Sequence, residues 1–164
     1  MEVLAHQKRK REILPVGLLA AVPARRPDNR VFTMLEDKLV KYTNIALPVS
    51  LEIPRPKKHV SILVRKNEVV SVGTNNFRTH PMAKKLGYRF EEVHSELDAL
   101  LRYKGPKDNL KLLNFRFNRF KDMRMSKPCC KCLPWCVALF DEIWYSTNIG
   151  MIPLKEIADD TRRI

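Results

Sequence analysis

The chain has 164 residues, with 31 Lys or Arg against 18 Asp or Glu, so its formal net charge is +13. This length suits one compact domain, and a hydrophobic content of 45% allows a core to form. So large a positive excess favours an anionic partner such as nucleic acid, although a basic surface can also serve solubility alone. No apolar run approaches the length needed to cross a bilayer, so no membrane-spanning segment is expected.

The amino-terminal region differs in composition from the rest of the chain. Residues 1–33 are rich in Arg and Pro and lack a clean period, which predicts a basic, partly helical arm before a domain at 34–164. The stretch Ile13–Ala24 after four basic residues superficially resembles a signal peptide. A proline and a glycine interrupt this stretch, and we therefore reject that interpretation.

The remaining pattern predicts alternating helices and strands. Apolar residues at helical spacing indicate helices, β-branched runs indicate strands, and Pro48, Pro54 and Pro56 indicate a linker. In chain order we expect a helix (about 32–45), a linker (46–58), an antiparallel β-hairpin (59–72), a loop (73–92) and a helix (93–104). A strand (110–117), a loop (118–128), a helix (129–140) and two strands (142–147 and 151–157) follow.

This order predicts an α/β fold, a mixed sheet of about five strands covered by helices. Only about three residues separate Thr147 from Met151. A connection between parallel strands needs a dozen residues or more, so we expect the last two strands to be antiparallel.

All four cysteines lie close together in the sequence, at Cys129, Cys130, Cys132 and Cys136. A disulfide framework would spread its cysteines along the chain to close loops, which this cluster cannot do. The cluster instead indicates metal ligands in a reducing compartment, and we expect a cytoplasmic protein.

Two short motifs are predicted to open neighbouring helices: His94-Ser95-Glu96 and Pro128-Cys129-Cys130-Lys131-Cys132. A catalytic zinc site uses three protein ligands and leaves the fourth position to water. Cys129 and Cys132 can turn both sulfurs toward one point, and a helix amino terminus favours their thiolates. His94 supplies a third ligand, and Glu96 can reach the bound water without ligating the metal.

The pairing of H-x-E with P-C-x-x-C is the signature of zinc deaminases. Over about residues 59–157 the chain resembles the cytidine deaminase-like superfamily, whose fold layers helices on both faces of a mixed sheet. The resemblance implies one catalytic Zn²⁺ held by His94, Cys129 and Cys132, with Glu96 as the proton shuttle. It also implies that Asn75, in a glycine-x-asparagine loop, hydrogen-bonds the substrate near its sugar.

Three features depart from the family pattern. Ser95 stands where the family most often has alanine, the gap between the two motifs is long, and Pro134 lies within the second helix. This proline leaves the orientation of Cys136 open. Residues 126–129 and 143–147 resemble viral and phage members, so the cytoplasm of a host cell is an alternative compartment.

Each motif also has a simpler interpretation. A structural zinc site would take a fourth protein ligand from Cys136 or Cys130, although a buried small residue is the more typical role for Cys130. His80 is more typical of a loop residue than of a ligand. Asn75 could merely satisfy turn geometry beside a glycine.

Charge placement bears on the substrate. Residues 101–131 hold ten Lys or Arg and two Asp, a net +8, in the segment that joins the two motifs. A basic groove rewards a polynucleotide through counterion release. Phe115, Phe117 and Phe120 could stack bases, but alternate phenylalanines on a strand more often face a core. The candidate nucleic-acid contacts are Arg116, Arg119, Lys121, Arg124 and Lys127.

Antiparallel final strands resemble the free-cytidine deaminases and some deaminase toxins, so cytosine is favoured over adenosine as the target base. The leading hypothesis is hydrolytic conversion of cytosine to uracil, with single-stranded DNA or RNA slightly favoured as substrate. One rival is a deaminase of free cytidine, deoxycytidine or deoxycytidylate. Another is a zinc-stabilised nucleic-acid-binding module without catalysis. The family resemblance also allows a homo-oligomer.

Overall fold

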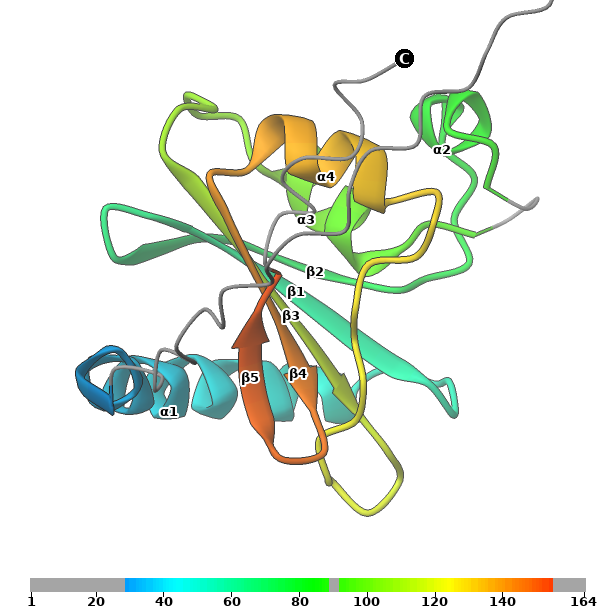
Figure 1. Cartoon of the computed structure of the whole chain (residues 1–164). Helices are drawn as coiled ribbons and strands as arrows, with labels where there is room; N and C mark the ends of the chain where they lie inside the picture. Colours follow the sequence, from blue (N-terminus) through cyan, green and yellow to red (C-terminus); the bar gives the residue numbers. More distant parts are fainter. Residues whose placement is uncertain (1–28, 89–91, 155–164) are drawn as a thin grey trace, which may run out of the picture.

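The computed structural model describes residues 29–88 and 92–154, which form a five-stranded sheet with helices on both faces (Figure 1). No helix in this described part of the chain is long and apolar enough to cross a membrane. The elements are α1 (Asn29–Leu51), β1 (Lys58–Arg65), β2 (Glu68–Thr74), α2 (Pro81–Lys85), α3 (Ser95–Arg102), β3 (Leu110–Phe117), α4 (Leu133–Leu139), β4 (Glu142–Thr147) and β5 (Gly150–Pro153).

The sheet has the predicted mixed topology, with strand order β2-β1-β3-β4-β5. Strand β1 is antiparallel to both β2 and β3, β3 and β4 are parallel, and β4 and β5 are antiparallel. The tight turn between β1 and β2 places Lys66 and Asn67 at positive φ, as a two-residue hairpin requires. The expected fold class and the antiparallel final pair are confirmed.

Alternation along the strands creates two cores, one on each face. Val60 and Phe115 belong to a cluster that packs against Tyr42 and Ala46 of α1. Residues of the opposite parity, such as Leu112, belong to the other cluster, which includes Leu97 of α3 and Cys136 of α4. The sheet is therefore the middle layer of three, with α1 on one side and α2, α3 and α4 on the other (Figure 1).

The first helix is longer than predicted. We expected it to end near residue 45 and a proline-containing linker to cover 46–58, but α1 continues to Leu51 with Pro48 inside it. Ala46 is fully buried against the sheet, so the apolar face of the helix extends beyond the predicted end. A proline there removes one backbone hydrogen bond, a loss that packing of the last turns offsets. The true linker is the short segment 52–57.

Other element bounds also differ from prediction. The loop expected over 73–92 contains the short helix α2, which begins at Pro81 with the Nδ1 atom of His80 accepting a hydrogen bond from the backbone of Met82 at 3.1 Å. Helix α4 begins only at Leu133, so Pro134 falls in its first turn, where proline is tolerated. The last strand ends at Pro153 rather than 157. The predicted amino-terminal arm, apart from residues 29–33 in α1, and everything after 154 lie outside the described residues.

Helix α3 lies directly against β2 at one glycine. A Cβ atom at Gly73 would come within 2.5 Å of the Ser95 carbonyl oxygen and would also collide with the backbone of Ala99. Two hydrogen bonds hold the same contact: Ser71 Oγ donates to the Ala99 carbonyl at 2.7 Å, and Asp98 Oδ2 accepts from the Thr74 N–H at 2.9 Å. The first turn of α3 is therefore fixed on the sheet by backbone-to-backbone contact.

Replacing Gly73 with alanine should displace α3, because both colliding groups are backbone and cannot swing aside. We expect Gly73→Ala to lower the free energy of unfolding by about 1–3 kcal/mol, measured by chemical denaturation. It should also weaken zinc binding, since His94 precedes this turn. The matched variant Ser71→Ala removes one hydrogen bond at the same contact and should cost about 1 kcal/mol with zinc binding retained. If the two variants lowered the free energy of unfolding and zinc binding equally, close contact of α3 with Gly73 would not be the cause.

Candidate zinc site and adjoining cavity

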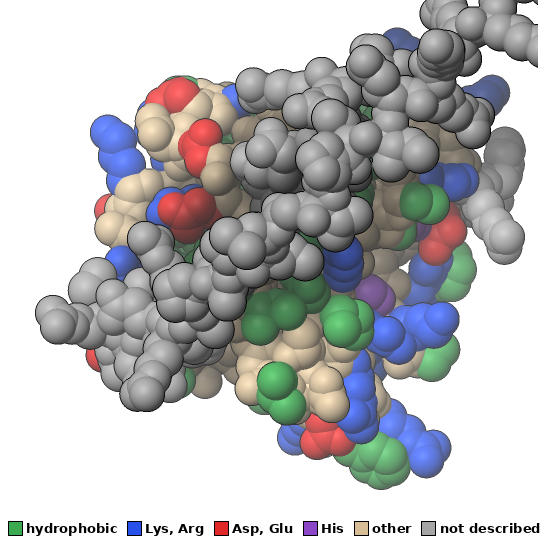
Figure 2. All heavy atoms as spheres, viewed as in Figure 1, with side chains coloured by type: hydrophobic (Ala, Val, Ile, Leu, Met, Phe, Trp, Pro, Cys, Tyr) green, Lys and Arg blue, Asp and Glu red, His purple; other side chains and the backbone are tan. Residues whose placement is uncertain are grey.

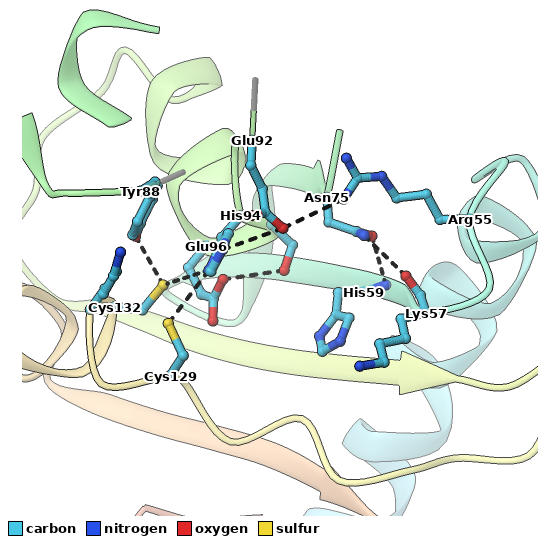
Figure 3. Close-up of polar contacts among 12 residues, drawn as sticks. Arg55, Lys57, His59, Asn75, Tyr88, Glu92, His94, Glu96, Cys129 and Cys132 are labelled. Atoms are coloured by element: carbon cyan, nitrogen blue, oxygen red, sulfur yellow. Dashed lines mark hydrogen bonds and ion pairs between the residues drawn. The ribbon is translucent and has the colours of Figure 1, made fainter. Parts of the chain in front are cut away.

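Three residues from two distant segments come together above the sheet (Figure 3). His94 is the N-cap of α3, Cys132 is the N-cap of α4, and Cys129 lies in the turn before α4. Their ligand atoms all lie within 4.8 Å of one another. The parallel pairing of β3 with β4 requires a crossover, and this crossover carries the cysteines over the amino terminus of α3.

The distances within this group suit a zinc ion. The Nδ1 atom of His94 lies 3.6 Å from Cys129 Sγ and 3.3 Å from Cys132 Sγ. Tetrahedral zinc, with zinc–sulfur distances of about 2.3 Å and a zinc–nitrogen distance of about 2.0–2.1 Å, would separate nitrogen and sulfur by about 3.6 Å. Imidazole and two thiolates are also ligands that zinc prefers. The three predicted ligands therefore fit the metal in both chemistry and spacing.

Two neighbours orient the His94 ring. Its Nε2 atom lies 3.8 Å from Glu92 Oε1, and the Tyr88 ring stacks on it with centroids 4.4 Å apart and an interplanar angle of 9°. A carboxylate beside Nε2 favours the tautomer that carries its proton there, which leaves Nδ1 free to bind a metal. The protein therefore presents the nitrogen that faces the two sulfurs.

Cys132 is the buried member of the group. The Tyr88 hydroxyl lies 2.9 Å from its sulfur and accepts a hydrogen bond from Trp135 Nε1 at 3.2 Å, so it can donate its own proton to Cys132. Burial, aided by the charge of Glu96, raises the pKa of the Cys132 thiol. A bound divalent cation reverses that preference by stabilising the thiolate.

The other two cysteines are not part of the group. Cys136 is fully buried in the core cluster below α4, where burial raises the pKa of its thiol. Cys130 is exposed, so the expectation that it is a buried small residue was wrong. Within the described residues the metal-binding group therefore offers three donors, the number typical of a catalytic zinc site rather than a structural one.

Glu96 lies beside this group in the first turn of α3, with only 6% of its surface exposed. Its Oε1 atom accepts a hydrogen bond from Asn114 Nδ2 at 3.1 Å, and its Oε2 atom is 3.4 Å from the Ser95 hydroxyl. Glu96 is not a member of the metal-binding group, and it lines the same cavity as His94 and Cys129. This geometry allows the predicted role of Glu96 as a proton carrier, which stays a prediction.

The cavity has a volume of about 420 Å³ and opens beside the metal-binding group. Its lining combines the candidate catalytic groups with polar, aromatic and cationic side chains. The lining residues are Arg55, Pro56, Lys57, His59, Asn75, Phe77, Glu92, His94, Ser95, Glu96, Lys127 and Cys129.

Asn75 lines this cavity while it also joins β2 to the start of β1. Its Oδ1 accepts a hydrogen bond from the His59 N–H at 2.9 Å, and its Nδ2 donates to the Lys57 carbonyl at 3.0 Å. The side chain therefore has a structural role in the loop. Its Nδ2 carries a second hydrogen, so the predicted contact with substrate stays a prediction that this geometry allows.

His59 presents a neutral imidazole to the cavity. Burial, together with the positive charges of Arg116, His94 and Lys57, lowers its pKa from 6.5 to about 4. At neutral pH the ring adds no charge. It can offer one donor and one acceptor to a bound molecule.

Arg55 forms the opposite wall of the cavity. Its guanidinium carbon lies 3.3 Å from the centroid of the Phe77 ring, and Nη1 is 3.6 Å from Glu92 Oε1. Only 13% of the Arg55 side chain is exposed. A cation held this firmly on an aromatic face, in a cavity wall, is suited to meet an anionic group on a ligand.

The five basic residues predicted to bind nucleic acid differ in their surroundings. Only Lys127 lines the cavity. Arg116 donates to the Met125 carbonyl, Arg124 pairs with Asp122 at 3.3 Å, and Arg119 lies over the Phe120 ring. Figure 2 shows Lys and Arg side chains mixed with apolar ones at the end of the molecule where the loop after β3 lies.

Two of the three phenylalanines considered for base stacking are buried, as the interpretation that they face a core predicts. Phe115 and Phe117 are buried in the sheet, as expected of alternate strand residues. Phe120 is 67% exposed in the loop that follows β3, so for this residue the core interpretation was wrong. The strand period ends at Phe117, and the position of Phe120 is set by the loop instead.

Sequence reasoning missed several residues around the site. Arg55, Phe77, Tyr88 and Glu92 belong to neither motif, and no local pattern marks them. His59 carried a weak signal, because a histidine at the start of an apolar strand is unusual. Asn114 carried a stronger one, since it interrupts the apolar run of β3 with a fully polar side chain.

No protein-family model matches the sequence, and no curated protein matches it. The structure is similar to two solved structures of dCMP deaminase from the cyanophage S-TIM5. The apo form has a TM-score of 0.43 and 15% identity, covering 70% of this chain and 83% of that chain. The complex with dCMP and dUMP has a TM-score of 0.41 and 14% identity, covering 73% and 83%.

The three-donor group should bind one zinc ion per chain, measured by elemental analysis of the purified protein. Cys129→Ser and Cys132→Ser should each lose most of this zinc, because each removes a ligand. The matched variants Cys130→Ser and Cys136→Ala should keep it. Zinc loss in either of these two variants would show a fourth protein ligand and would favour a structural site.

Proposed function

We propose that the protein is a zinc-dependent hydrolytic deaminase that converts cytosine to uracil in a nucleotide. The observation that carries this proposal is the position of Glu96, a buried carboxylate beside a three-donor metal group and in the same cavity. A purely structural zinc site has no use for such a carboxylate. A non-catalytic zinc module also predicts a fourth protein ligand, which the described residues do not supply.

The chemistry divides between the metal and one side chain. Zinc, when held by His94, Cys129 and Cys132, supplies Lewis-acid activation of water at neutral pH. Glu96 accepts the proton of the attacking water and delivers it to the ring nitrogen next to the amino-bearing carbon. It then carries a second proton to the departing amine, which leaves as ammonia. Burial of the carboxylate limits proton exchange with bulk water during these transfers.

The cavity favours a single nucleotide over a nucleoside. Three cations line it: Arg55, Lys57 and Lys127. One phosphate needs one or two cations, and the guanidinium of Arg55 is held against the Phe77 ring. A volume of about 420 Å³ is in the range of small-molecule sites. A free cytosine nucleotide such as deoxycytidylate is therefore the substrate that the cavity supports best, in place of the single-stranded polynucleotide favoured by charge alone.

A polynucleotide substrate remains the second candidate because of one feature. The loop between β3 and Cys129 carries Arg119 and the exposed ring of Phe120, and it lies at the end of β3 near the cavity. An exposed aromatic ring beside a cation is suited to stack a base of a single strand. This candidate predicts a strong dependence of activity on salt.

Replacing Glu96 with alanine should abolish turnover while zinc stays bound, because Glu96 carries protons and does not ligate the metal. We expect kcat to fall at least 10²- to 10⁴-fold, with zinc content unchanged by elemental analysis. Loss of zinc in this variant would instead indicate that Glu96 helps to hold the metal. Normal turnover would rule out the proposed mechanism.

The substrate class can be decided by comparing deoxycytidylate, deoxycytidine, single-stranded DNA and single-stranded RNA in one deamination assay. We expect deoxycytidylate to be the best substrate. Lys127→Ala should raise KM for deoxycytidylate about tenfold, as expected for the loss of a charge-assisted contact to phosphate, and leave deoxycytidine unaffected. The matched variant Arg119→Ala, outside the cavity lining, should change neither. If Arg119→Ala impairs only turnover of DNA or RNA, and these are the better substrates, the polynucleotide candidate is correct.

A further inference from the structure

Three polar side chains are buried beneath Glu96, in the layer between α3 and the sheet. Ser61 is fully buried, and Ser95 and Asn114 are each 2% exposed. Buried polar groups cost free energy unless they are hydrogen-bonded, and apolar residues would fill these positions without that cost. Their presence in a buried layer therefore calls for a reason beyond packing.

The antiparallel register of β1 and β3 brings these side chains together. Ser61 and Asn114 are directly opposite each other in that register, and Ser95 begins the helix that lies on the same face. Ser61 Oγ lies 2.8 Å from Ser95 Oγ and donates to Asn114 Oδ1 at 2.7 Å. An alanine at position 95 could not make this contact, so the serine belongs to the same network.

The network fixes which way the Asn114 amide points. Because Oδ1 accepts from the Ser61 hydroxyl, Nδ2 must face Glu96, where it donates to Oε1 at 3.1 Å. A flipped amide would turn a carbonyl oxygen toward the carboxylate, where neither group has a proton to donate. Ser61 thus acts on Glu96 through Asn114.

The two oxygens of Glu96 consequently differ. Oε1 is held by Asn114, whereas Oε2 has one weak contact among the described residues, 3.4 Å from the Ser95 hydroxyl. A carboxylate that moves protons needs one oxygen anchored and one available to the reacting atoms. The contact with Asn114 also limits rotation of the carboxylate about its last side-chain bond.

We propose that Asn114, itself oriented by Ser61, is the positioning residue of Glu96 and reserves Oε2 for proton transfer. This inference rests on the proposed function for its effect on rate. Its structural content, the orientation of the carboxylate, does not depend on which substrate is turned over.

The test uses two variants of the zinc-loaded 164-residue chain and one matched control. Asn114→Leu removes the donor with little change in volume. Asn114→Asp keeps an acceptor for Ser61 but has no amide donor, and it serves if the leucine variant does not fold. Leu112→Ala lies on the same strand and face, is fully buried, and reports destabilisation alone. Crystal structures, zinc content and steady-state kinetics are measured for each protein.

The proposal predicts that the Glu96 carboxylate is rotated or spread over several orientations in both Asn114 variants, with zinc content unchanged. It also predicts that kcat falls roughly 10- to 100-fold, a part of what a general acid–base group contributes, while KM stays within about twofold. Leu112→Ala should lower the melting temperature but leave the carboxylate ordered and kcat nearly unchanged.

Two results would overturn the proposal, and each is distinct from failure of the proposed function. One is an unchanged Glu96 orientation in both Asn114 variants, which can be seen even if the wild-type protein deaminates no cytosine compound. The other is an active wild type whose Asn114 variants lose no more kcat than Leu112→Ala. An inactive wild type with displaced carboxylates in the variants would reject the substrate assignment and leave the positioning role intact.

Discussion

The close approach of α3 to the sheet at Gly73 is the constraint on which the rest of the site depends. Because no Cβ separates the helix from β2, the first turn of α3 reaches the layer of polar side chains on β1 and β3. This depth buries Glu96 and leaves His94, two residues earlier at the N-cap, at the rim of the cavity. The crossover that joins the parallel strands β3 and β4 carries Cys129 and Cys132 of the second motif over this turn.

His94 and Glu96, both in the first motif, are oriented by their neighbours in the same way. Each has two atoms that can bind a partner, and the protein occupies one while leaving the other available. For His94, Nε2 faces Glu92 and Nδ1 faces the sulfurs. For Glu96, Oε1 is bonded to Asn114 and Oε2 has only a weak contact with Ser95. Neighbouring groups that orient a ligand or a proton carrier in this way fix its function as firmly as the residue itself does.

The sequence predicted those parts of the molecule whose signals are local. The candidate metal ligands and Glu96 lie in two short motifs, the β-hairpin has a turn between β-branched runs, and the short final connection forces antiparallel strands. The network beneath Glu96 could not be predicted, because Ser61 and Asn114 are 53 residues apart and meet only through strand register. Pro48 misled the prediction, since a proline in the last turns of a well-packed helix is tolerated.

Hydrolytic deamination can be tested directly by tracing the source of the new oxygen atom in the product. Zinc-loaded protein would be incubated with deoxycytidylate in water enriched in ¹⁸O, and the product analysed by mass spectrometry together with released ammonia. We expect the deoxyuridylate formed to carry one ¹⁸O atom, with one ammonia released for each molecule of product. Absence of uracil product from deoxycytidylate and from every other cytosine substrate, in protein that has bound one zinc, would contradict it.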